Sequence, residues 1–91
     1  MAKKKDSQLP IPRHLWVQVV ASWQLPPQVA RVGERILRCY KDRRIATDMG
    51  LKIPTVRTYI TRLFQLTDSD DRQDFIVNAW RKSREIEGGR V

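Results

Sequence analysis

The segment between Gly50 and Phe64, GLKIPTVRTYITRLF, is rich in arginine, lysine and threonine side chains and contains no carboxylate. Its apolar residues recur at the spacing of one helical face, and Arg57, Thr58 and Thr61 fall outside that apolar stripe. A guanidinium group donates paired hydrogen bonds, and threonine offers both a hydroxyl and a methyl group. These residue types are typical of a surface that binds a partner rich in hydrogen-bond acceptors.

The rest of the sequence lacks a grouping of residues that would support catalysis or metal binding. No combination of serine, histidine and carboxylate stands out, and there is no glycine-rich phosphate loop. The single histidine, His14, and the single cysteine, Cys39, exclude a zinc finger and an intramolecular disulfide. We therefore expect a non-enzymatic protein without metal or cofactor. For Cys39, a half-buried apolar role is favoured over a reactive thiol.

Positive charge is concentrated in the first two thirds of the chain. The 91 residues include 18 Lys and Arg against 10 Asp and Glu, for a net charge of +8. Residues 1–66 carry a net charge of +9, whereas residues 67–91 carry −1. Such a field attracts polyanions at long range. On charge, nucleic acid is the favoured partner, although an anionic membrane or an acidic protein would be attracted in the same way and a solvated basic surface with no partner remains open.

The basic N-terminal sequence MAKKKD is not followed by an apolar run long enough for a signal peptide or a membrane span. We therefore expect a cytoplasmic protein that does not associate with a membrane. The lysines of this segment are candidates for contact with DNA phosphates.

Hydrophobic spacing divides the chain into four parts. Residues 1–11 are predicted to be a disordered basic tail, residues 12–24 an amphipathic helix, residues 25–85 a helical domain and residues 86–91 a frayed C-terminus. Within the domain, helices are expected at about 27–40, 43–49, 54–66 and 70–85. Because no segment alternates with a period of two over the length of a strand, the predicted fold class is all-α.

Each predicted helix has an apolar stripe that should face the core. The stripes consist of Leu15, Trp16, Val19, Val20 and Trp23; Val29, Val32, Ile36, Leu37 and Tyr40; Ile45, Ala46 and Met49; Ile53, Val56, Ile60, Leu63 and Phe64; and Phe75, Ile76, Ala79 and Trp80. Asp42 is the expected N-cap of the helix at 43–49, and Gly50 the left-handed residue at its end. Gly33 would allow another helix to approach closely.

A short helix, a glycine turn and a second helix with a basic outer face together indicate a helix-turn-helix. The chain from Leu25 to Trp80 also resembles the DNA-binding domain of LuxR-type (GerE- or FixJ-type) bacterial transcription regulators. The resemblance rests on LPP at 25–27, CYKDRRIA at 39–46, MGL at 49–51, TVRTY at 55–59, RLF at 62–64 and Asp71–Arg72. In two places the chain departs from the family pattern: Cys39 replaces a glycine, and Lys52 replaces the Ser or Thr that caps the recognition helix.

The resemblance implies a four-helix helix-turn-helix domain, here with an additional N-terminal amphipathic helix, in a nucleoid-associated protein. It assigns contacts with base edges to Arg57, Thr58 and Thr61, and contacts with phosphates to Arg43, Lys52, Thr55 and Arg62. It also makes the last helix a candidate homodimer contact, with Gln73, Ile76, Val77 and Trp80 on the candidate faces. A related regulator and RNA polymerase are further candidate partners.

Several alternatives remain open from the sequence. Arg57 could be only a solubilising residue, and Arg62 could pair with Asp48 or another acid in place of a phosphate. The N-terminal helix could enlarge the core, which is favoured, or form a dimer contact. The second hypothesis for function is a protein-interaction module that retains the fold and forms a heterodimer with a related regulator. Its working surface would be the last helix together with Trp16 and Trp23.

Overall fold

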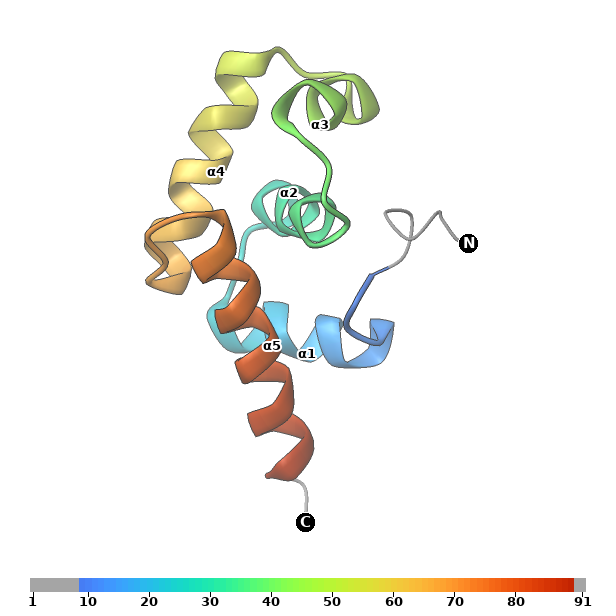
Figure 1. The fold of residues 1–91 in the computed structure, drawn as a ribbon, viewed down its shortest axis with the longest axis vertical. Coiled ribbons are helices and arrows are strands. Elements are labelled where there is room, and N and C mark those ends of the chain that lie inside the picture. The colour runs from blue at the N-terminus through green and yellow to red at the C-terminus, as the bar shows by residue number, and fades with distance from the viewer. Residues whose placement is uncertain (1–8, 90–91) are drawn as a thin grey trace.

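The computed structural model describes residues 9–89, which form five helices and no strand (Figure 1). The all-α fold class is therefore confirmed for this part of the chain. The helices are α1 Arg13–Trp23, α2 Pro27–Leu37, α3 Asp42–Met49, α4 Ile53–Thr67 and α5 Arg72–Gly88. Residues 1–8, which include most of the predicted tail and its lysines, lie outside the described residues, as do Arg90 and Val91.

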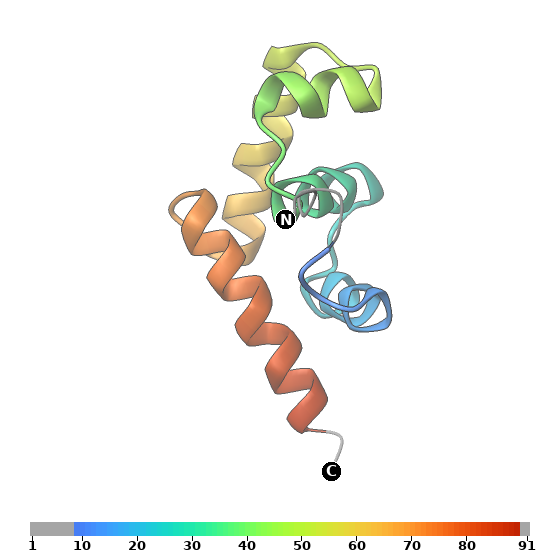
Figure 2. The same ribbon diagram turned by 45° about the vertical axis from the view of Figure 1, so that its right-hand side comes forward.

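Helix α2 lies at the centre of the arrangement and packs chiefly against α4 (Figure 1). Helix α3 packs against α4 at one end of the molecule, and α1 packs against α5 at the other. In the turned view, α4 and α5 follow one another along one side while α1 and α2 lie on the other (Figure 2). This arrangement leaves the long side of α4 that faces away from α2 open to a partner.

The predicted apolar stripes of α1 to α3 form the core. Nine of the residues predicted in these stripes are buried at the centre of the cluster: Leu15, Trp16, Val19, Val29, Val32, Ile36, Leu37, Ile45 and Ala46. Tyr40, just after α2, is also buried, while Val20, Trp23 and Met49 are partly buried and pack against the cluster. The N-terminal helix thus enlarges the core, as favoured from the sequence. It does not stand apart as a free dimer contact.

Phe75 lies where four helices meet. Its ring is fully buried and lies 6.3 Å from the ring of Trp23 in α1 and 6.4 Å from that of Phe64 in α4, measured between centroids. A Cβ atom added to Gly33 in α2 would lie 3.3 Å from both Phe75 and Leu63. The close approach predicted at Gly33 is therefore confirmed, and it depends on the missing side chain.

The structure corrects several predicted boundaries. Ile11, predicted to be in the disordered tail, is fully buried, so ordered packing begins before residue 12. Helix α4 begins one residue earlier than predicted, at Ile53. Helix α5 begins at Arg72 rather than at residue 70, because the Asp71 side chain accepts a hydrogen bond from the backbone N–H of Asp74 and caps the helix. It also continues to Gly88, beyond the predicted end at residue 85.

The burial predicted for α5 is only partly correct. Phe75 and Ala79 are fully buried and Ile76 is partly buried, but Trp80 is 50% exposed. The side chain of Trp80 lies beneath the guanidinium of Arg84, whose central carbon is 4.7 Å from the ring centroid. The prediction that Trp80 belongs to the core was therefore wrong. Trp80 follows the buried Ala79 by one residue, so its side chain lies about 100° further around the helix.

Cys39 is exposed, which contradicts the half-buried role predicted for it. Helix α2 ends at Leu37, and Cys39 adopts a left-handed backbone conformation with φ of 69°. The N–H of Cys39 bonds to the carbonyl of Ile36, and that of Tyr40 bonds to the carbonyl of Arg35. Cys39 therefore reverses the chain at a position where glycine is the favoured residue.

Replacing Cys39 by glycine is expected to stabilise the protein by about 1 kcal/mol, because a left-handed conformation is costly for a residue with a Cβ atom. Urea denaturation of the two proteins measures this difference. The same change at Ala30, within α2, should destabilise the protein by a similar amount. An unchanged or lower stability of Cys39→Gly would contradict the explanation.

Candidate nucleic-acid interface

The turn between α3 and α4 is short and closed by backbone hydrogen bonds. Gly50 ends α3 with φ of 67° and ψ of 35°, which confirms its predicted left-handed conformation. The N–H of Leu51 then bonds to the carbonyl of Ala46 at 2.9 Å. An added Cβ on Gly50 would meet no atom within 4 Å, so the backbone angle, not space, requires glycine here. The turn fixes the angle at which α4 leaves α3.

The inner side of α4 holds the helix in place. Val56 and Leu63 are seven residues apart and therefore lie on the same face of the helix. Both are fully buried in the core. Since α4 packs against α2 and α3, these two anchors fix which side of the helix faces outward.

The three residues expected to contact base edges, Arg57, Thr58 and Thr61, are all exposed on the outer side of α4. The hydroxyl of Thr58 donates to the carbonyl of Pro54 at 3.1 Å, which leaves its methyl group and its oxygen lone pairs available to a partner. No described segment covers these side chains. Between Gly50 and Thr67 the chain contains no acidic residue, so nothing on this helix itself opposes an anionic partner.

The four residues assigned to phosphates, Arg43, Lys52, Thr55 and Arg62, are also exposed. Lys52 precedes α4, makes no side-chain cap and leaves the first N–H groups of the helix uncapped by a side chain. The alternative pairing of Arg62 with Asp48 does not occur, because Asp48 accepts a hydrogen bond from Nε of Arg35 at 2.6 Å. Exposed cations therefore lie at the start of α3, before α4 and along α4 itself.

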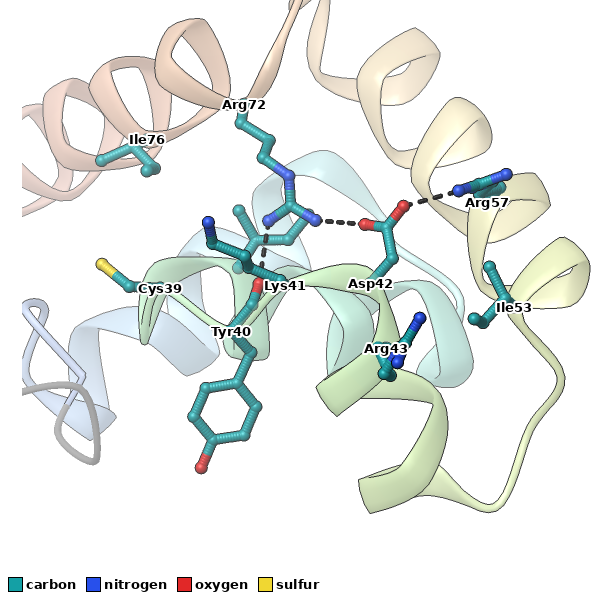
Figure 3. Close-up of a pocket in the computed structure, with 10 residues that line it drawn as sticks. Cys39, Tyr40, Lys41, Asp42, Arg43, Ile53, Arg57, Arg72 and Ile76 are labelled. Carbon is teal, nitrogen blue, oxygen red and sulfur yellow. Dashed lines mark hydrogen bonds and ion pairs between the residues drawn. The ribbon is translucent and has the colours of Figure 1, made fainter.

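Asp42 links the outer side of α4 to the start of α5. Its Oδ2 accepts a hydrogen bond from Nε of Arg57 at 3.2 Å, and its Oδ1 pairs with Nη2 of Arg72 (Figure 3). Nη1 of Arg72 donates in turn to the carbonyl of Tyr40 at 2.9 Å. The predicted N-cap role of Asp42 is wrong: it is the first residue of α3, and Lys41 is the N-cap. Its carboxylate is directed towards the two arginines.

These residues line a concave groove of about 610 Å³ between α3, α4 and the start of α5 (Figure 3). Its charged lining consists of four cations and one carboxylate: Lys41, Arg43, Arg57, Arg72 and Asp42. Isoleucines contribute the apolar part of the surface. The groove is thus a cationic extension of the outer side of α4.

No pattern in the sequence indicates that Asp42 and Arg72 are partners of Arg57. The three residues are separated by 15 positions between Asp42 and Arg57 and by 30 between Asp42 and Arg72. No helical periodicity relates them, because their contact depends on how α3, α4 and α5 cross. In the sequence, Asp71 and Arg72 stand out only through the resemblance to the LuxR-type pattern.

The candidate dimer residues lie along α5. Gln73, Val77 and Trp80 are exposed, and Ile76 is partly buried. Val77 is 44% exposed, and an apolar cavity of about 200 Å³ lies beside it, lined by Pro10, Ile11, Leu37, Ile76, Val77 and Trp80. Trp16, by contrast, is 2% exposed, and Trp23 packs against Phe75. The two tryptophans of α1 therefore offer little surface to a partner.

No family model, curated protein or solved structure matches the chain. Within residues 9–89, no helix is long and apolar enough to cross a membrane. The same residues contain no cluster of three or more His, Cys, Asp or Glu side chains that could hold a metal ion.

Proposed function

We propose that this protein binds double-stranded DNA sequence-specifically as a small transcription regulator, with α4 as the recognition helix in the major groove. The observation that carries the proposal is the exposed outer side of α4, which presents Arg57, Thr58 and Thr61 with no acidic residue on the helix. A major groove about 12 Å wide admits an α-helix. In the LuxR-type domain that the chain resembles, the corresponding helix enters the major groove, which supports the same role for α4.

The chemistry of each side chain suits a duplex. The two terminal nitrogens of Arg57 can donate to O6 and N7 of one guanine, and the threonine methyl groups can pack against a thymine methyl. Arg43, Lys52, Thr55 and Arg62 would bind phosphates on either side and fix the register of the helix. The backbone N–H groups of Ile53 and Thr55, in the first turn of α4, would add a further phosphate contact, whereas Pro54 between them has no N–H to donate.

The proposal is tested by titrating the protein with random-sequence DNA and then selecting bound duplexes from a random pool. Binding with a dissociation constant below tens of micromolar at moderate salt, followed by enrichment of one sequence, is the expected result. No retardation of any DNA at that concentration would reject the proposal. The enriched sequence would also give the symmetry of the site.

A homodimer formed through α5 is part of the proposal, because Val77 and Trp80 expose apolar surface beside an apolar cavity. Such a dimer would favour inverted half-sites about 10 bp apart, centre to centre. The same surface also supports the second candidate function, heterodimerisation with a related regulator. Because Trp16 is buried and Trp23 packs against Phe75, α5 is the only surface that we propose for this heterodimer.

Replacing Trp80 by glutamate is expected to convert a dimer to a monomer that remains folded, since half of this side chain is already exposed. Sedimentation equilibrium over a range of concentrations measures the change. Val17→Glu, which alters an exposed valine on α1, is the matched control and should leave the dimer intact. A wild-type protein that is monomeric at every concentration would contradict the homodimer.

A further inference from the structure

We propose that Asp42 is a positioning residue that orients Arg57 for base recognition and is itself held by Arg72. This inference rests on the proposed function. Three contacts form a continuous chain from the carbonyl of Tyr40 through Arg72 and Asp42 to Arg57. The chain connects α5 to the recognition helix across the start of α3 (Figure 3).

The atom that Arg57 uses is the basis of the inference. The carboxylate of Asp42 accepts from Nε, the innermost nitrogen of the guanidinium group. Both terminal nitrogens, which form a bidentate pair with guanine, make no hydrogen bond to any described residue. Asp42 can therefore hold the guanidinium plane while Arg57 contacts a base, so recognition does not require this ion pair to break.

The Arg57 side chain needs such a restraint because it is 70% exposed. A free arginine samples many rotamers, and ordering it on binding costs conformational entropy. Asp42 limits this sampling before DNA arrives. Arg72 in turn holds Asp42, because one of its terminal nitrogens binds the carboxylate and the other is fixed on the Tyr40 carbonyl.

The position of Asp42 also has an electrostatic consequence. Its negative charge lies among Lys41, Arg43, Arg57 and Arg72 and lowers the attraction of the groove for any phosphate. Random DNA, which Arg57 can contact only through phosphates, gains nothing from an oriented guanidinium. Asp42 is therefore expected to lower the affinity for random DNA more than the affinity for the specific site, and so to raise the ratio of specific to random affinity.

The test compares Asp42→Ala with Asp48→Ala, which removes the same charge from the same helix but from a residue paired with Arg35. Dissociation constants are measured for the selected duplex and for the same duplex in which the guanine assigned to Arg57 is replaced by another base. Asp42→Ala should lower the discrimination between them about five-fold, the lower end of what one bidentate pair contributes. Asp48→Ala should strengthen binding to both duplexes equally and leave discrimination unchanged.

A double variant separates positioning from a structural role. If Asp42 acts through Arg57, adding Asp42→Ala to Arg57→Ala should change discrimination no further. An additional loss in the double variant would overturn the inference. Asp42→Asn, which is nearly isosteric, replaces the alanine variant in this cycle if the latter does not fold.

The restraint itself can be measured without DNA. The Nε–H signal of Arg57 in the NMR spectrum of the wild-type protein should exchange slowly with water, and exchange should become faster in Asp42→Ala but not in Asp48→Ala. Equal exchange in all three proteins would overturn the inference while leaving the proposed function intact. A wild-type protein that shows the restraint but prefers no DNA sequence would instead overturn the proposed function, and the recognition role with it.

Discussion

Arg57→Ala is expected to remove the preference for one base pair of the binding site and to weaken binding to random DNA only slightly. A bidentate arginine–guanine pair contributes roughly 1–3 kcal/mol of discrimination, which corresponds to about 5- to 150-fold. The side chain is exposed and anchors no part of the core, so the fold should be unaffected. Selection from a random pool, repeated with the variant, measures the lost preference directly.

The matched control for this prediction is Arg62→Ala on the same helix. Arg62 is also exposed and forms no ion pair with another described residue. If Arg62 contacts a phosphate, Arg62→Ala should weaken binding to all sequences alike and reduce the dependence of affinity on salt by about one ion. Equal loss of specific and random binding in Arg57→Ala would show that Arg57 also contacts only phosphate.

Phe75→Ala is expected to destabilise the protein by about 3–5 kcal/mol, the usual cost of removing a buried phenylalanine side chain. The ring is fully buried and lies against Trp23 and Phe64, and Gly33 makes room for it in α2. Four helices would therefore lose packing at once. Since small domains are stable by only about 5–15 kcal/mol, the change should lower the melting temperature strongly.

Chemical denaturation followed by tryptophan fluorescence measures this effect, because Trp23 lies beside the substituted ring. Val77→Ala, two residues along the same helix and 44% exposed, is the control and should change stability little. If Phe75→Ala were as mild as Val77→Ala, α5 would not be joined to α1 and α4 as the structure describes.

The sequence allowed the helices to be predicted well because each carries an apolar stripe at helical spacing. Proline and glycine also mark several of the boundaries: Pro27 lies at the first position of α2, and Gly50 ends α3. These signals are local, so a few neighbouring residues are enough to interpret them. The exposure of Arg57, Thr58 and Thr61 followed from the same periodicity.

The features that could not be predicted depend on how helices cross. Trp80 continues an apolar pattern, and only the position of α1 against α5 shows that its side chain remains exposed. Asp42 is of a residue type that commonly caps helices, but its carboxylate pairs with Arg72, which lies 30 residues later in α5. Cys39 gives no local sign of exposure, because its conformation is imposed by the chain reversal after α2.

The most direct test of the central claim is an NMR titration of the ¹⁵N-labelled protein with the duplex obtained by selection. If α4 enters the major groove, the largest changes in amide chemical shift should lie between Lys52 and Arg62 and at the start of α3. Smaller changes should occur along α5, on the other side of the groove lined by Arg72. Changes confined to α5, with the amides of α4 unmoved, would contradict the account.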